Sequence, residues 1–306
     1  MHTYLARRLL QMIPVLLLVT MTIFFIIRVK GDPVAQLAPV DLLTPEEIAE
    51  LRHAYGFDRP IYVQYAEFLR GLMRGDFGTS FRYRTPALPL VVERLPKTME
   101  LAGAAGLLAW VLALPLGIIS AVKRNSLIDL VATTASVLGR ALPNFWLGII
   151  FILVFAVVLG WLPVSGSDTP AHLVLPAATL GVGLATTLTR LIRSSMLEVI
   201  RQDYITTARS KGVAEPTVLT RHALRNGLIP VLTVFGLQSA WLMGGVVVVE
   251  QVFAWPGMGQ LMVKAVLTRD MSIVQAGVFV FAVIVLGVNL AIDLLYTVLD
   301  PRIRYG

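Results

Sequence analysis

The sequence predicts an all-α, polytopic membrane protein with about six transmembrane helices. Of its 306 residues, 56% are hydrophobic and only 15% are charged, and the mean hydropathy is +0.75. Soluble domains carry about 25% charged residues, so a soluble core could not hide this much apolar surface. Backbone polar groups have no water partner in lipid, so apolar runs of about 20 residues are expected to cross the bilayer as α-helices.

Each expected span is a long apolar run in the sequence. The runs cover residues 9–29, 98–122, 141–160, 173–191, 228–252 and 273–299. The first run follows Arg7 and Arg8, but it is longer than the apolar core of a signal peptide and has no small-residue cleavage pattern, so it is interpreted as a retained helix. Residues 126–160 exceed one perpendicular span and contain Pro143. They are expected to form either a kinked, tilted helix or an amphipathic cytoplasmic helix that leads into the span.

Three regions are expected along the chain: an N-terminal segment with the first span (1–30), an external region (31–97) and a core membrane domain (98–306). In the external region, Thr44-Pro45-Glu46-Glu47 has the pattern of a capping box, and Gly56 is the expected end of that helix. A second surface helix is expected over 60–73 from its apolar spacing. The sequence GDFGTS that follows is typical of turns.

The distribution of positive charge predicts the orientation of the spans. Short cytoplasmic loops accumulate Lys and Arg. Lys123 and Arg124 follow the second span, the linker over 161–172 has no Lys or Arg, and Arg302 and Arg304 lie near the end of the chain. This pattern predicts that both termini are cytoplasmic and that the long loops after the first and fifth spans are external.

The sequence lacks the residue patterns that mark several classes of function. The formal charge of +7 is interpreted as a membrane charge bias rather than as a nucleic-acid site. The chain has no cysteine, no GxxxxGK[ST] phosphate-binding loop and no HExxH, and Ser239 in GLQSA lacks the second glycine of a nucleophile elbow. No catalytic residue, metal site or cofactor bound by this chain is therefore expected.

A polar, basic segment separates the fourth and fifth expected spans. Residues 198–227, hereafter the basic segment, are longer than the usual connection of about two to eight residues between packed helices. A short helix is expected over 204–210, with Gly212 as a stop or left-handed turn. A second helix is expected from near Pro216 to Leu224. Two such surface helices joined by a bend would suit docking of another protein.

At these residues the chain resembles the dipeptide, oligopeptide and nickel permease family of ATP-binding cassette importers. The resemblance covers nearly the whole chain. It is carried by the sequences ARRLLQMIP, GFDRPIYVQY, GDFGTS, LPNFWLG, YITTARSKG, RHALRNGLIPVLT, GLQSAWLMGGVVVVEQVFAWPGMG and DLLYTVLDPRIRYG. The resemblance implies a permease fold of the type I importer class with a cytoplasmic coupling helix, in a bacterial inner membrane.

The resemblance also implies partners and site residues. The partners would be a homologous second permease, two cytoplasmic ATPase subunits that use ATP and Mg, and an external solute-binding protein. Residues implied in ATPase coupling are Tyr204, Thr206, Thr207, Ala208, Arg209, Lys211, Gly212 and Val213. In the general importer pattern EAA, three residues, then Gly, the acidic position is Thr206 here. Ala208 and Gly212 are expected to permit close seating on the ATPase, and Arg209 and Lys211 to pair with acidic groups there.

Further candidates lie in the spans and the external loops. Asn144, Trp146 and Gln238 are candidates for lining the pathway. Glu250 is expected to face external water or a partner, and the binding protein is expected to contact the external loops through residues that include Glu250, Trp255, Pro256 and Gly257. Short peptides are the expected solute, with nickel chelates, glutathione or another small solute as alternatives. The competing class is an autonomous carrier or channel, which would need ion-coupling residues deep in the spans.

Overall fold

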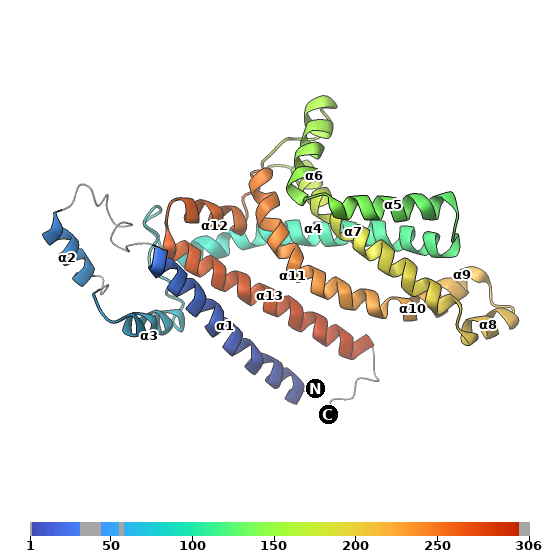
Figure 1. The fold of residues 1–306 in the computed structure, drawn as a ribbon, viewed down its shortest axis with the longest axis horizontal. Coiled ribbons are helices and arrows are strands. Elements are labelled where there is room, and N and C mark those ends of the chain that lie inside the picture. The colour runs from blue at the N-terminus through green and yellow to red at the C-terminus, as the bar shows by residue number, and fades with distance from the viewer. Residues whose placement is uncertain (1, 31–43, 55–57, 300–306) are drawn as a thin grey trace. The chain divides into compact units, whose positions relative to one another are not determined.

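The computed structural model describes residues 2–30, 44–54 and 58–299, and the described chain is almost entirely helical (Figure 1). Five helices are long and apolar enough to cross a membrane, or six when one bent pair counts as a span. These five are α1 (His2–Lys30), α4 (Ala87–Val122), α7 (Ala171–Ile200), α11 (Ile229–Val252) and α13 (Met271–Leu299). The all-α membrane fold is therefore confirmed, and α4 and α7 are longer than the apolar runs that predicted them.

The span expected over 141–160 is broken near its start. Helix α5 (Leu127–Ala141) begins after Ser126, whose hydroxyl accepts the amide of Asp129 at 3.3 Å. Leu142 and Pro143 are extended, since a residue before proline is disfavoured in the helical region. The chain then continues at 109° as α6 (Asn144–Phe151) and the π-helix η3 (Ile152–Val158). The sequence allowed either one kinked helix or an amphipathic helix that leads into a span. The observed break fits the second of these better.

The chain divides into two compact units, and the first holds Met1–Lys97 and Pro256–Leu286. It contains α1, α2 (Pro45–Ala54), α3 (Ile61–Leu72) and α12 (Met258–Leu267). The capping box is confirmed, because the backbone amide of Thr44 donates to Glu47 at 2.8 Å and the amide of Glu47 donates to Thr44 Oγ1 at 3.3 Å. Gly56 lies outside the described residues. Within GDFGTS, only Gly75 lies in a turn; Gly75 and Gly78 have positive φ, and Thr79 forms an isolated bridge with Pro86.

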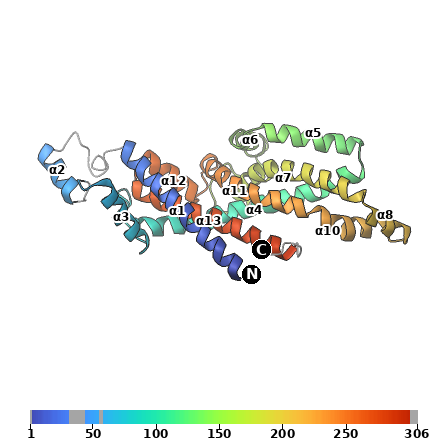
Figure 2. The same cartoon turned by 60° about the horizontal axis from the view of Figure 1, so that its bottom comes forward.

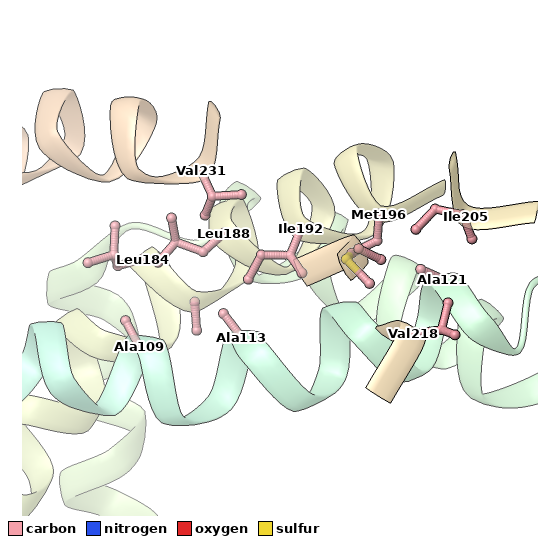
Figure 3. Close-up of a cluster of buried hydrophobic side chains, with 12 residues drawn as sticks. Ala109, Ala113, Ala121, Leu184, Leu188, Ile192, Met196, Ile205, Val218 and Val231 are labelled. Carbon is pink, nitrogen blue, oxygen red and sulfur yellow. The ribbon is translucent and has the colours of Figure 1, made fainter. Parts of the chain in front are cut away.

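The second unit holds Thr98–Trp255 and Gly287–Gly306, and α7 is its central helix. Helix α7 packs against α5, α6 and α11. Its buried residues Leu184, Leu188, Ile192 and Met196 face small side chains of α4, including Ala109 and Ala113 (Figure 3). Alanines let the two helices approach closely, which is the usual means of helix packing in membranes. The same cluster continues into the segment that follows α7.

Candidate functional site

The basic segment folds into two short helical pieces at the end of α7. After a break at Arg201 and Gln202, helix α8 (Asp203–Ser210) forms, and a turn then leads to α9 (Glu215–Thr217), the π-helix η4 (Val218–Ala223) and α10 (Leu224–Gly227). Figure 2 shows α8 at the end of the bundle, beyond α7 and α10. Both expected helices are therefore present, joined by a bend at Lys211–Ala214.

Gly212 ends α8 in a Schellman motif. Its φ is +77°, in the left-handed region. The amide of Gly212 donates to the carbonyl of Arg209 at 2.9 Å, and the amide of Val213 donates to the carbonyl of Ala208 at 3.3 Å. Val213 and Ala208 also pack on the same hydrophobic core. The left-handed turn expected at this glycine is confirmed.

We expect Gly212→Ala to destabilise the end of α8 more than Gly212→Asn. A methyl group at this position would meet nothing within 4 Å, so the cost of alanine is conformational, about 1–2 kcal/mol for a left-handed residue. Asparagine tolerates this conformation better. The measurement is hydrogen exchange at the amides of residues 208–213 in the two variants, which reports local loss of protection. Equal losses in the two variants would show that space at this position, and not backbone conformation, is what matters.

Helix α8 is held by Ile205 and Tyr204, and α10, which contacts Tyr204, is in turn held to α7. Ile205 is fully buried in the core that includes Met196 and Val218 (Figure 3). Asn226 Nδ2 donates to the hydroxyl of Tyr204 at 2.8 Å. Ser195 Oγ of α7 donates to the carbonyl of Gly227 at 2.7 Å. These contacts link α8 to α7 both directly, through Ile205, and indirectly, through α10.

An ion pair spans the bend after α8. Arg209 Nε and Nη2 donate to the two carboxylate oxygens of Glu215 at 3.0 and 2.6 Å. The hydrogen bond from Arg209 holds the pKa of Glu215 below its usual value. Arg209 was expected to pair with acidic groups of an ATPase, whereas here its partner lies within the basic segment. Thr206 stands where the general pattern has an acidic residue. Arg209 nevertheless has a carboxylate partner within the basic segment, that of Glu215.

Replacing Glu215 by glutamine is expected to loosen the bend at neutral pH. Because the pKa of Glu215 is lowered by folding, the pair stabilises the segment above the unfolded pKa and is lost as pH falls through the folded pKa. Amides of residues 210–217 in Glu215→Gln should exchange hydrogen faster than in the native protein at pH about 7, and the two should converge in acid. Glu198→Gln, at another exposed acidic residue of the basic segment, is the control. It should leave the exchange of the amides of residues 210–217 unchanged. A pH-independent difference would contradict the role of the charge.

The residues implied in coupling fall into two groups. Ala208 and Val213 are half-buried and pack on the core, and the close seating expected of Ala208 stays a prediction. The others are exposed on the outer side of α8 and its turn; they are Tyr204, Thr206, Thr207, Arg209, Lys211 and Gly212. This outer side is the surface that α8 offers to a partner.

Two of the three candidate pathway residues line one polar pocket. Asn144 of α6 and Gln238 of α11 face a hollow of about 480 Å³ beside α7. Thr187 and Trp241 line it as well, whereas Trp146 does not. The amide of Asn144 lies between two glycines, because a methyl group added at Gly183 would be 3.2 Å from its oxygen and one at Gly245 would be 3.0 Å from its nitrogen. The two glycines therefore make room for this amide.

The residues proposed for external contact are largely buried. Glu250 has no exposed surface, and Thr98 Oγ1 donates to its carboxylate at 2.6 Å, so the expectation that Glu250 faces water is wrong. Trp255 is 1% exposed and Gly257 is also buried, whereas Pro256 is half-buried. A carboxylate taken out of water needs hydrogen-bond partners, and Thr98 of α4 supplies one that the hydropathy pattern does not reveal.

A buried acid was missed by the sequence interpretation. Asp129 of α5 accepts hydrogen bonds from Arg193 Nε at 2.6 Å and Nη2 at 2.8 Å. It also accepts from Ser120 Oγ of α4 and from the backbone amide of Asn125 at 2.9 Å. These contacts tie the start of α5 to α4 and α7. The signal in the sequence was Arg193, a charge near the end of an apolar run, which calls for a partner.

Comparison with known proteins identifies the family. The family described as "Binding-protein-dependent transport system inner membrane component" matches residues 113–305, and its N-terminal component matches residues 1–102. Among curated relatives, the oligopeptide transport system permease protein AppB of Bacillus subtilis (strain 168) is 42% identical, with 100% of both chains covered. The di/tripeptide transport system permease protein DppB of Pseudomonas aeruginosa (strain UCBPP-PA14) is 40% identical over 100% of this chain and 99% of its own. The glutathione transport system permease protein GsiC of Salmonella choleraesuis (strain SC-B67) is also 40% identical over 100% of both chains.

Solved structures show the same fold. A chain of the MetNI methionine ABC transporter, in an inward-facing conformation, is 20% identical with a TM-score of 0.55 over 69% of this chain and 96% of that chain. A chain of an amino acid ABC transporter is 15% identical, with a TM-score of 0.51 over 70% of this chain and 94% of its own. The family is shown by the sequence match over the whole chain, and the helical bundle with several apolar spans agrees with it. This chain belongs to the family of inner membrane components of binding-protein-dependent transport systems, and it is a multi-pass permease subunit of an ABC importer.

Proposed function

We propose that this chain forms half of the translocation pathway of an ATP-driven importer for short peptides. The observation that carries the proposal is its similarity over the full length to permeases of oligopeptide and di/tripeptide transport systems. The pocket around Asn144 and Gln238 supports it, because amide side chains can both donate to and accept from peptide groups. Glutathione is the second candidate solute, favoured by the relative that transports it.

The working complex, in this proposal, has a homologous second permease, two cytoplasmic ATPase subunits and an external solute-binding protein. The outer side of α8 docks on an ATPase subunit. That subunit binds Mg and hydrolyses ATP, whereas this chain binds neither ATP nor Mg. Both termini then lie in the cytoplasm, and residues 31–97 and 253–272 lie outside, where they receive the binding protein. Because Glu250, Trp255 and Gly257 are buried, this contact rests on other residues of the external loops. Closure of the ATPase pair moves α8 and, through its contacts with α7, the pathway helices.

Uptake of labelled trialanine by proteoliposomes containing the complete transporter tests the solute. Trialanine is expected to be taken up, and an excess of unlabelled dipeptide is expected to compete with it. A matched preparation that lacks this chain is the control. Failure of trialanine uptake, with glutathione uptake intact, would assign the chain to the second candidate solute.

A further inference from the structure

A second pocket adjoins the polar pocket along α7. Its volume is about 510 Å³, and Thr187 lines both hollows. The residues that line it are Thr133, Val137, Thr187, Arg190, Leu191, Arg193, Ser194 and Val234. Gly183, Thr187, Arg190 and Ser194 recur at helical spacing, so they share one face of α7. The two pockets therefore follow one another along a single strip of this helix.

Arg190 carries the uncompensated charge of the second pocket. The other cation there, Arg193, is held by both carboxylate oxygens of Asp129. The lining has no acidic side chain. Arg190 is exposed, and no hydrogen bond or ion pair reaches its side chain from the part of the chain that the structure describes. A charged side chain within a helix that can span a membrane is costly and is usually retained for a partner.

The spacing of polar groups on this strip matches a short peptide. Gly183, which lines the same pocket as Asn144, precedes Arg190 by two helical turns, about 10 Å along the axis. An extended tripeptide spans about 10 Å. One solute can thus reach from the amides of Asn144 and Gln238 to the guanidinium of Arg190. The hydroxyls of Thr187 and Ser194 lie on the same face and can donate to the same ligand.

We propose that Arg190 binds the carboxylate of the transported solute. Guanidinium presents parallel donors that match a carboxylate, and such charge-assisted pairs are stronger than neutral hydrogen bonds. The class of ligand is a small solute with a terminal carboxylate, which covers short peptides and glutathione. The inference rests on the proposed function and adds to it a selectivity residue in the membrane part of the transporter.

Uptake of trialanine and of its C-terminal amide by the complete reconstituted transporter tests this role. Arg190→Gln is expected to lower uptake of the free acid about tenfold, the loss of one charge-assisted hydrogen bond, and to leave uptake of the amide unchanged. Arg190→Lys should retain most of the uptake of the acid. Arg124→Gln, at an exposed loop arginine outside both pockets, is the matched control. Equal losses for acid and amide in Arg190→Gln would overturn the inference, because they would indicate a partner in the second permease subunit.

A single cysteine gives an independent readout when the binding protein does not deliver the amide. The chain has no native cysteine, so the Arg190→Cys variant carries a single thiol, at position 190. Modification with a cationic methanethiosulfonate is expected to restore trialanine uptake, and an anionic reagent of similar size is expected to abolish it. Restoration by both reagents would overturn the role of the charge. Absence of peptide uptake by the native transporter would refute the proposed function itself, whereas normal uptake that is indifferent to charge at this position would refute only this inference.

Discussion

Replacing Ile205 by alanine is expected to separate ATP hydrolysis from transport. Ile205 has no exposed surface and joins α8 to the core around α7. Truncating a buried isoleucine side chain to alanine costs about 3 kcal/mol, which weakens the attachment of α8 to α7. The ATPase subunits would still bind and hydrolyse ATP, but their movement would no longer reach the pathway helices.

The measurement for Ile205→Ala is the number of peptides taken up per ATP hydrolysed. We expect this ratio to fall at least about tenfold, because a loss of about 3 kcal/mol corresponds to roughly a hundredfold change in the equilibrium for attachment of α8. Ile205→Val, which retains most of the buried side chain, is the matched control and should keep most of the native ratio. A native ratio in Ile205→Ala would show that this anchor does not carry the movement.

Breaking the Asp129–Arg193 pair is expected to have the largest effect on stability. The side chains are 6% and 27% exposed, respectively. Removal of one member leaves the other buried without its charge partner, at a cost of about 3–5 kcal/mol. Asp129→Asn and Arg193→Gln should each lower the thermal unfolding midpoint of the detergent-solubilised complex and loosen α5 from α7.

The double variant separates the ion pair from general damage to the fold. With both charges removed, neither is left unpaired, so Asp129→Asn/Arg193→Gln should be clearly less destabilised than the sum of the two single variants. Coupling of about 1–3 kcal/mol is expected for side chains in direct contact. Additive losses would contradict a direct energetic link between α5 and α7.

Local signals in the sequence predicted most of the elements. Hydrophobic runs gave the spans, the Thr44–Glu47 pattern gave a helix start, and Gly212 gave the end of α8. Each of these depends on residues close together in the chain. The break at Leu142 and Pro143 was foreseen only as one of two arrangements, because a proline permits either a kink or a break and the packing of α6 on α7 decides between them.

Pairings across helices were the part that the sequence did not reveal. Glu250 was expected to face external water or a partner because it lies at the outer end of an apolar run, but it is fully buried and accepts a hydrogen bond from Thr98, far away in the chain. Asp129 and Arg193 are 64 positions apart. Asn144 and Gln238 line one pocket that Trp146 does not line, and the pathway role of all three stays a prediction. Periodicity identifies which face of a helix is polar, and it does not identify the partner of a polar group.

The most direct measurement of the central claim is peptide uptake by proteoliposomes with and without the ATPase subunits. The permease pair and the loaded binding protein are present in both preparations, and an ion gradient is applied in each. An ATP-driven importer predicts uptake only when the ATPase subunits and ATP are both supplied. Sustained uptake driven by the ion gradient without the ATPase would contradict the account, and it would identify the chain as part of an autonomous carrier.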